Sequence, residues 1–203
     1  MDAAGFPLID FRAADILAFS GRSRLSRLIK AATVPPWYWF RAHWRCVNHV
    51  AILARLKDDD GTARLFAIEA TTQASEPCAI THRLVSGVQA HLPTRLVASY
   101  PGYVFRARIN WASKVQWTEH QLLSDFLQQF VGQPYDYLDA VRSATGRSHL
   151  PSLKSLFCSE VVAAALVRIG RLPADQAPDR YTPAKLMKRL VYNGIYDTPV
   201  RIK

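Results

Sequence analysis

Residues 48–72, NHVAILARLKDDDGTARLFAIEATT, are the stretch that decides the fold. Apolar and β-branched residues dominate both of its ends, which predicts two strands over 48–56 and 64–72. The polar run 57–61 separates them, and a polar loop this short joins neighbouring strands into an antiparallel hairpin. We therefore expect a sheet built around this hairpin.

Two polar residues interrupt the apolar strands of the hairpin. If its loop is centred on Asp59, antiparallel pairing sets His49 directly opposite Glu69, with both side chains on one face and Cβ atoms roughly 4.5–5.5 Å apart. An imidazole and a carboxylate in apolar surroundings are costly unless they pair. The pair fits a general base with its orienting group. It equally fits a buried ion pair that only fixes register, and a one-residue slip would separate the two side chains.

The remaining pattern predicts a mixed α+β fold in a single domain over 1–203, with a central antiparallel sheet packed by helices. Further strands are expected over 14–20 and 103–109. Apolar residues at helical spacing predict helices over 22–32, 118–131, 161–169 and 182–191, the second of them opened by a capping box at 118–121.

The chain is basic, with a formal net charge of +10 at pH 7. Such a charge fits an anionic surface or polymer as partner, but the basic residues are spread along the chain, which also fits an ordinary solvated surface. No stable nucleic-acid partner is expected.

The sequence shows no signal peptide and no apolar run as long as a transmembrane segment. Three cysteines do not make a secreted disulfide framework. The cytoplasm is therefore the expected location, unless a partner delivers the protein to the cell envelope.

Cys158 is the candidate nucleophile. It lies in LFCSE, residues 156–160, at the start of an apolar helix, where the helix dipole and first-turn N–H groups stabilise a thiolate. The alternative is a buried packing residue, because free cysteine is among the most buried residue types. Ser159 is expected to serve the helix start as a hydroxyl, and Glu160 as a first-turn carboxylate rather than a catalytic group.

Several short motifs resemble one known family. They look like motifs of the circularly permuted papain-like amidases of the YiiX and YaeF type, which are relatives of the NlpC cell-wall peptidases. In that family the histidine comes first, the polar orienting residue second and the cysteine last, as in this chain. The resemblance spans roughly residues 14–192, and its motifs are DILAFSG (15–21), NHVAIL (48–53), IEA (68–70), GQPYDY (132–137) and LFCSE (156–160).

The resemblance implies a circularly permuted papain-like fold and a cysteine hydrolase that needs no cofactor and no metal. Cys158 would attack an amide in a peptide, cell-wall or aminoacyl substrate, with His49 as base and Glu69 orienting the imidazole. Tyr135 matches a tyrosine that lines the substrate cleft in this family, and it fits equally well a loop tyrosine packed on the core. The aromatic insertion over 35–44 departs from the family pattern.

A zinc site is an alternative interpretation of the same region. His43, Cys46 and His49, with Cys78 and His82 downstream, are residue types that bind zinc, although their spacing fits no common zinc finger.

Two further functions stay open. The aromatic residues over 37–44 alternate with arginines and could bind lipid, sugar or a single nucleic-acid strand, and related permuted families include enzymes that act on lipid acyl groups. An acyl-lipid substrate would therefore use the same catalytic residues. A catalytically inactive module that holds an anionic ligand is the alternative from a different class.

Overall fold

The computed structural model describes residues 9–21, 43–71, 76–110, 116–134, 157–174 and 181–203. Within these ranges the chain forms strands, four α-helices and a short 3-10 helix. In chain order the elements are β1 (Ile16–Gly21), η2 (Trp44–Cys46), β2 (His49–Lys57), β3 (Ala63–Thr71), β4 (Gly87–His91), α2 (Pro93–Ser99), β5 (Gly102–Ala107), α3 (Trp117–Phe130), α5 (Phe157–Arg168), α6 (Pro183–Tyr192) and β6 (Val200–Arg201).

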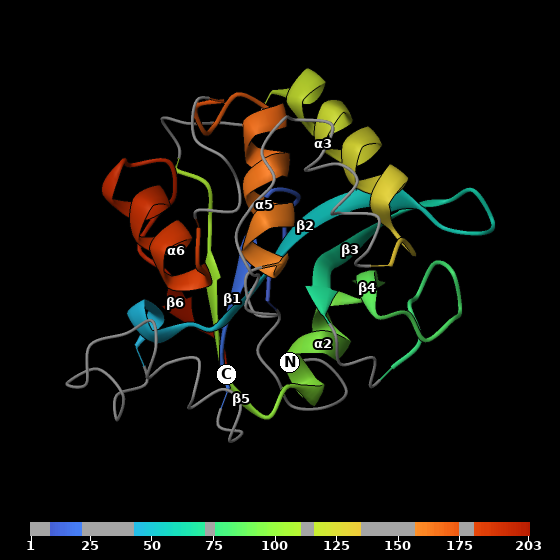
Figure 1. Ribbon diagram of the computed structural model, residues 1–203, viewed down its shortest axis with the longest axis horizontal. Coiled ribbons are helices and arrows are strands. Elements are labelled where there is room, and N and C mark those ends of the chain that lie inside the picture. Colours follow the sequence, from blue (N-terminus) through green and yellow to red (C-terminus); the bar gives the residue numbers. More distant parts are fainter. Residues whose placement is uncertain (1–8, 22–42, 72–75, 111–115, 135–156, 175–180) are drawn as a thin grey trace, which may run out of the picture.

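The strands form a six-stranded antiparallel sheet in the order β4-β3-β2-β1-β5-β6 (Figure 1). The predicted hairpin, β2 and β3, lies at its centre, with β4 beside β3 and β1 beside β2. The predicted mixed class with a central antiparallel sheet is confirmed.

Most predicted strands and helices lie within two residues of the observed ones, although α5 begins four residues before the predicted stretch. The sequence did not predict β4, α2 or β6, because these elements are too short for a periodic pattern to stand out. The predicted helix over 22–32 lies outside the described residues.

The turn of the hairpin closes one residue later than predicted. Lys57 still belongs to β2 and pairs with Ala63, which centres the turn on Asp60. The reason is the hydrogen bond that closes the loop, in which the Asp58 N–H donates to the Thr62 carbonyl at 3.1 Å. The whole register of β2 against β3 moves with the turn.

The expected direct opposition of His49 and Glu69 is therefore wrong. The pairing of β2 with β3 ends at Ile52↔Ile68, and both strands continue beyond that pair. If the same register is continued past Ile52, His49 and Glu69 are diagonal neighbours on the two strands rather than directly opposite each other. Because the shift amounts to two residues in the pairing, both side chains still project from the same face.

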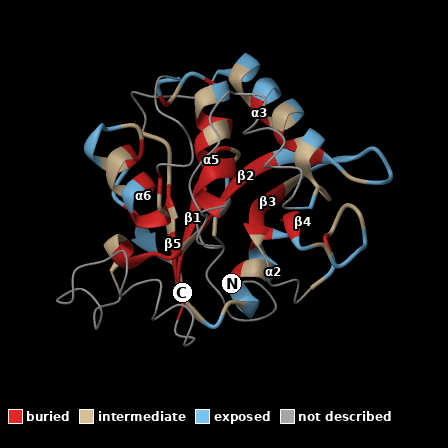
Figure 2. Cartoon of the chain, in the orientation of Figure 1, coloured by how far each residue is buried: buried red, intermediate tan, exposed pale blue. Residues whose placement is uncertain are grey.

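The two faces of the sheet are covered differently. Even-numbered residues of the hairpin, such as Ile52 and Ile68, are fully buried in the cluster that includes α3, α5 and α6. Odd-numbered residues, such as Leu53 and Ala67, pack with Val97 of α2 in a smaller cluster. Figure 1 shows α3, α5 and α6 over one face, and Figure 2 shows the central strands buried beneath them. Each fully buried large aliphatic side chain stabilises the fold by about 1.5–3 kcal/mol. Because the cluster beneath α3, α5 and α6 holds more buried residues than the cluster beneath α2, it supplies most of the core.

The capping box of α3 lies two residues before its predicted position. The N-cap is Gln116, and the Glu119 carboxylate accepts from the Gln116 backbone N–H at 2.6 Å. At α6 the predicted cap is confirmed, because the Thr182 hydroxyl accepts from the Lys185 N–H at 3.3 Å. Gly170 has a φ of +71°, a conformation that favours glycine, and follows the end of α5 as predicted.

Candidate active site

His49 and Glu69 form a hydrogen-bonded pair on the α2 face of the sheet. The distance between His49 Nε2 and Glu69 Oε2 is 2.7 Å. The side chains are 19% and 8% exposed, so water screens the pair weakly. A charge-assisted hydrogen bond of this length fixes the orientation of both groups.

Burial and charge act in opposite directions on the pKa of each member of this pair. Burial by itself lowers the pKa of His49, but the charges of Cys158 and Glu69, and hydrogen bonds with both, hold it well above its ordinary value. Burial by itself raises the pKa of Glu69, but the charge and hydrogen bond of His49, with the charge of His91, bring it below its ordinary value. Both shifts favour an imidazolium beside a carboxylate.

Cys158 reaches His49 from the opposite layer of the molecule. It lies in the first turn of α5, which packs across β2 and β3, and it is 3% exposed. Its hydrogen bond with His49 is one of the causes that raise the pKa of that histidine. The structure therefore brings together Cys158, His49 and Glu69, the three residues that the sequence suggested.

The start of α5 is tied to the segment that leads into α6. The Ser159 side chain is fully buried, and its hydroxyl donates to the carbonyl of Tyr181. Glu160 is buried in the first turn, where a carboxylate interacts favourably with the helix dipole. Glu160 is thus a first-turn carboxylate, as the sequence suggested, while the Ser159 hydroxyl joins α5 to the segment before α6.

Glu69 also has neighbours on β4, the edge strand. Gln89 pairs with Glu69 across the ladder, and the two are buried. His91, two residues further along β4 and on the same face, has its Nε2 3.7 Å from Glu69 Oε1 and 3.0 Å from Gln89 Oε1. The carboxylate thus lies between two imidazoles.

Aromatic rings line the other side of His49. Phe19 lies opposite His49 in the β1–β2 ladder, with ring centroids 5.5 Å apart. Tyr100, just after α2, packs on Phe19 at 4.7 Å. Burial, together with the charges of Glu69 and Cys158, raises the pKa of Tyr100 far above its ordinary value. Its hydroxyl is therefore a neutral hydrogen-bond donor near the two acidic groups.

The beginning of the GQPYDY motif docks on β4. The Val88 N–H donates to the Gln133 carbonyl at 3.0 Å, and the Gly132 N–H donates to the Val88 carbonyl at 2.9 Å. A Cβ on Gly87 would lie only 2.8 Å from the Pro134 Cα, so this approach requires glycine. The next residue, Tyr135, the predicted cleft tyrosine, lies outside the described residues.

Sequence reasoning missed three residues of this site: Gln89, His91 and Tyr100. The first two lie on β4, a strand that was not predicted, so their alternation along one face could not be recognised. The spacing of His91 two residues after Gln89 was the one available signal, because it matches the period of a strand. Nothing in the sequence distinguished Tyr100 from other tyrosines.

Three of the candidate zinc ligands make other contacts. His43 Nδ1 accepts from the Arg45 N–H, and Cys78 Sγ accepts from the Ala90 N–H. His82 pairs with Asp59 on the exposed hairpin loop. Among the described residues, no group of three or more His, Cys, Asp or Glu side chains is arranged to hold a metal ion.

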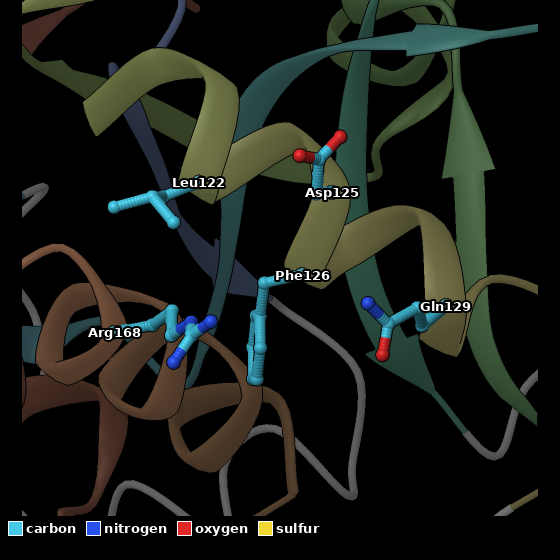
Figure 3. A pocket seen from close by; sticks show the side chains of 5 residues that line it. All are labelled: Leu122, Asp125, Phe126, Gln129 and Arg168. Atoms are coloured by element: carbon cyan, nitrogen blue, oxygen red, sulfur yellow. The ribbon is translucent and has the colours of Figure 1, made fainter. Parts of the chain in front are cut away.

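A hollow of about 380 Å³ lies between α3 and α5 (Figure 3). Its lining includes Phe126 and Gln129 of α3, with Arg168 of α5. Cys158 lies in the first turn of α5 and Arg168 is its last residue, and ten residues of α-helix span about 15 Å. The hollow is therefore remote from the thiol.

The aromatic stretch is described only at its end. Trp44 is buried in the main core cluster, and the Arg45 guanidinium lies 5.4 Å from its ring centroid and 5.7 Å from that of Tyr192. Trp44 thus packs against the protein itself, while residues 37–42 lie outside the described ranges. The helices within those ranges are all too short or too polar to cross a membrane.

The chain is similar to a solved structure from Escherichia coli O157:H7, the metalloprotein yiiX. The TM-score is 0.48 and the sequence identity 18%, and the match covers 93% of this chain and 87% of that one. No family model and no curated protein matches the chain. Similarity at this level does not assign a family, so the side chains of the site are what bears on function.

Proposed function

We propose that this protein is a cysteine hydrolase that cleaves an amide bond through a covalent acyl-enzyme on Cys158. His49 is the general base and Glu69 the carboxylate that orients it. The observation that carries the proposal is the 2.7 Å distance between His49 Nε2 and Glu69 Oε2, on an imidazole that also hydrogen-bonds Cys158. We further propose a circularly permuted papain-like fold related to the NlpC peptidases, because the chain order of the three residues and the sequence motifs match that family.

Each nitrogen of the imidazole has its own task in the proposed mechanism. Glu69 accepts a hydrogen bond from Nε2, which places a proton on that nitrogen. The nitrogen left for the thiol is Nδ1, which then accepts the proton of Cys158. The carboxylate both selects this tautomer and stabilises the imidazolium that forms, as the orienting acid of a catalytic triad does.

The reaction follows from this arrangement. The Cys158 thiolate attacks the carbonyl carbon, a C–S bond forms, and the carbonyl π electrons move to oxygen. The backbone N–H of Cys158, in the first turn of α5, is the proposed donor to that oxyanion. Collapse breaks the C–N bond while the His49 imidazolium gives its proton to the leaving amine. Water, deprotonated by His49, then cleaves the thioester to release a carboxylic acid and regenerate the thiolate.

The proposed substrate is an amide in a peptide, cell-wall or aminoacyl compound. The net charge of +10 favours an anionic substrate or surface, because a basic protein attracts such partners over several ångströms. An acyl-lipid ester would need the same catalytic residues and would release a fatty acid instead of an amine.

A substrate screen tests the proposal. Wild type and Cys158→Ala would be offered peptidoglycan fragments, aminoacyl amides and phospholipids, with released amine and fatty acid measured separately. We expect amine release by the wild type and a loss of at least about 10³-fold in Cys158→Ala. Cys46→Ala, at a second buried cysteine, is the matched control and should retain turnover.

Each other outcome contradicts part of the proposal. Turnover that survives in Cys158→Ala would refute the nucleophile. Fatty-acid release in place of amine release would replace the amide substrate by an acyl lipid. No turnover, together with equal iodoacetamide labelling of all cysteines, would indicate an inactive binding module.

A further inference from the structure

Glu69 is a carboxylate shared by two histidines. Its Oε2 lies 2.7 Å from His49 Nε2, and its Oε1 lies 3.7 Å from His91 Nε2. His91 is 8% exposed and Glu69 7%. His91 is thus a second imidazole buried against this carboxylate, and the proposed reaction does not use it.

Gln89 determines which nitrogen of His91 carries a proton. The Gln89 side-chain amide donates from Nε2 to the Val85 carbonyl, which can only accept. This directs Gln89 Oε1 toward His91, where it lies 3.0 Å from Nε2. Because Oε1 can only accept, His91 must carry a proton on Nε2. That N–H faces Gln89 Oε1 and, at longer range, Glu69 Oε1.

We propose that His91 is a positioning residue of the active site. Its Nε2–H, oriented by Gln89, attracts Oε1 of Glu69, so that Oε2 stays directed at His49. The inference deepens the proposed function and rests on it, because it extends the site from three residues to five. The hydrogen bond to Oε2 and the attraction on Oε1 together oppose rotation of the carboxylate away from the imidazole that it orients.

The charge on Glu69 depends on its neighbours. The titratable groups around it are His49, His91 and Tyr100, whose hydroxyl is neutral. Burial opposes ionisation of the carboxyl, and the two histidines favour it. Without His91, only His49 offsets the effect of burial on the ionisation of Glu69. The Glu69 carboxylate should then take up a proton at a higher pH and lose its charge-assisted hydrogen bond with His49.

The test compares His91→Leu, which removes the donor, with His91→Gln, which keeps an N–H of similar reach. The Glu69 pKa would be measured by carboxyl ¹³C NMR, and the alkylation rate of Cys158 by iodoacetamide would be followed between pH 4 and 9. In His91→Leu we expect the Glu69 pKa and the acid limb of the alkylation profile to rise by about one unit. At a pH below the Glu69 pKa of both proteins the rate should fall about tenfold, and His91→Gln should restore most of it.

The control is His82→Gln, at an exposed histidine between β3 and β4 that pairs with Asp59 of the hairpin loop, and it should change neither the Glu69 pKa nor the alkylation rate. Thermal unfolding would establish that the variants are folded. If His91→Leu does not fold, Gln89→Leu serves instead, because it removes the group that orients the His91 proton and should shift both quantities in the same direction.

The outcomes separate this inference from the proposed function. A folded His91→Leu with an unchanged Glu69 pKa overturns the role of His91, whatever the thiol does. A wild-type Cys158 no more reactive than Cys46 refutes the proposed function, while the NMR titration still decides the question of His91.

Discussion

The protein contains two histidine–carboxylate pairs of similar geometry in very different places. His49 and Glu69 lie 2.7 Å apart with side chains 19% and 8% exposed, at the buried end of the central hairpin. His82 and Asp59 lie 3.0 Å apart at its loop, with both side chains 65% exposed. The distances alone would not distinguish a catalytic pair from a surface ion pair.

The difference between the pairs is environmental. Exposed ion pairs are screened by water and contribute at most about 1 kcal/mol. The buried pair is shielded, shares its imidazole with Cys158, and shows shifted pKa values in both members. The proposed chemistry therefore depends on the burial of the pair and on its contact with Cys158, rather than on the distance within the pair.

The largest expected effect comes from removing the histidine of each pair. His49→Ala should slow alkylation of Cys158 by iodoacetamide at pH 7 by about 100-fold, because the thiol loses the group that takes its proton. His82→Ala should leave the rate unchanged. Mass spectrometry of peptides containing each cysteine measures both. An equal effect of the two substitutions would show that the buried pair has no special relation to the thiol.

A smaller effect is expected from neutralising the carboxylate of each pair. Glu69→Gln keeps the shape of the side chain but removes its charge, which should lower the pKa of His49 and slow alkylation at pH 7 about 10- to 100-fold. Asp59→Asn should change the rate less than twofold. The comparison fails if the two variants have the same rate at matched thermal stability.

The smallest effect concerns the pH dependence of stability. Folding lowers the pKa of Glu69. Its contribution to the free energy of unfolding is therefore present above about pH 4.3, the pKa in the unfolded chain, and is lost as the pH falls through the pKa in the folded protein. Folding raises the pKa of His49. Its contribution to the free energy of unfolding is therefore fully present below about pH 6.5, the pKa in the unfolded chain, and is lost as the pH rises through the pKa in the folded protein.

The pair therefore stabilises the fold most between about pH 4.3 and 6.5, with slopes of up to about 1.4 kcal/mol per pH unit outside this window. Urea unfolding across pH, for wild type and the double variant His49→Gln/Glu69→Gln, measures the difference. The matched double variant His82→Gln/Asp59→Asn should follow the wild-type curve. If the difference in unfolding free energy between wild type and His49→Gln/Glu69→Gln does not change with pH, the directions of the two pKa shifts are contradicted.

Local sequence signals predicted the hairpin, the helices α3, α5 and α6, and the face that His49 and Glu69 share. Strand alternation is a local property, and a shift of two residues in the pairing preserves it, so the shared face survived an incorrect register. The register itself depended on the hydrogen bond from Asp58 to Thr62, which the composition of the loop did not reveal. The position of Cys158 in the first turn of α5 was likewise predicted from the sequence, although the apolar periodicity begins only at Val161.

The sequence by itself determined the class of the sheet, the residues of the hairpin that share a face, and the position of a cysteine at a helix start. Each of these follows from periodicity over a few residues. Only the tertiary structure decided that α5 brings Cys158 to His49, and that β4 places Gln89 and His91 against Glu69. Those contacts join segments from 20 to 109 residues apart in sequence, and local periodicity carries no information about such pairings.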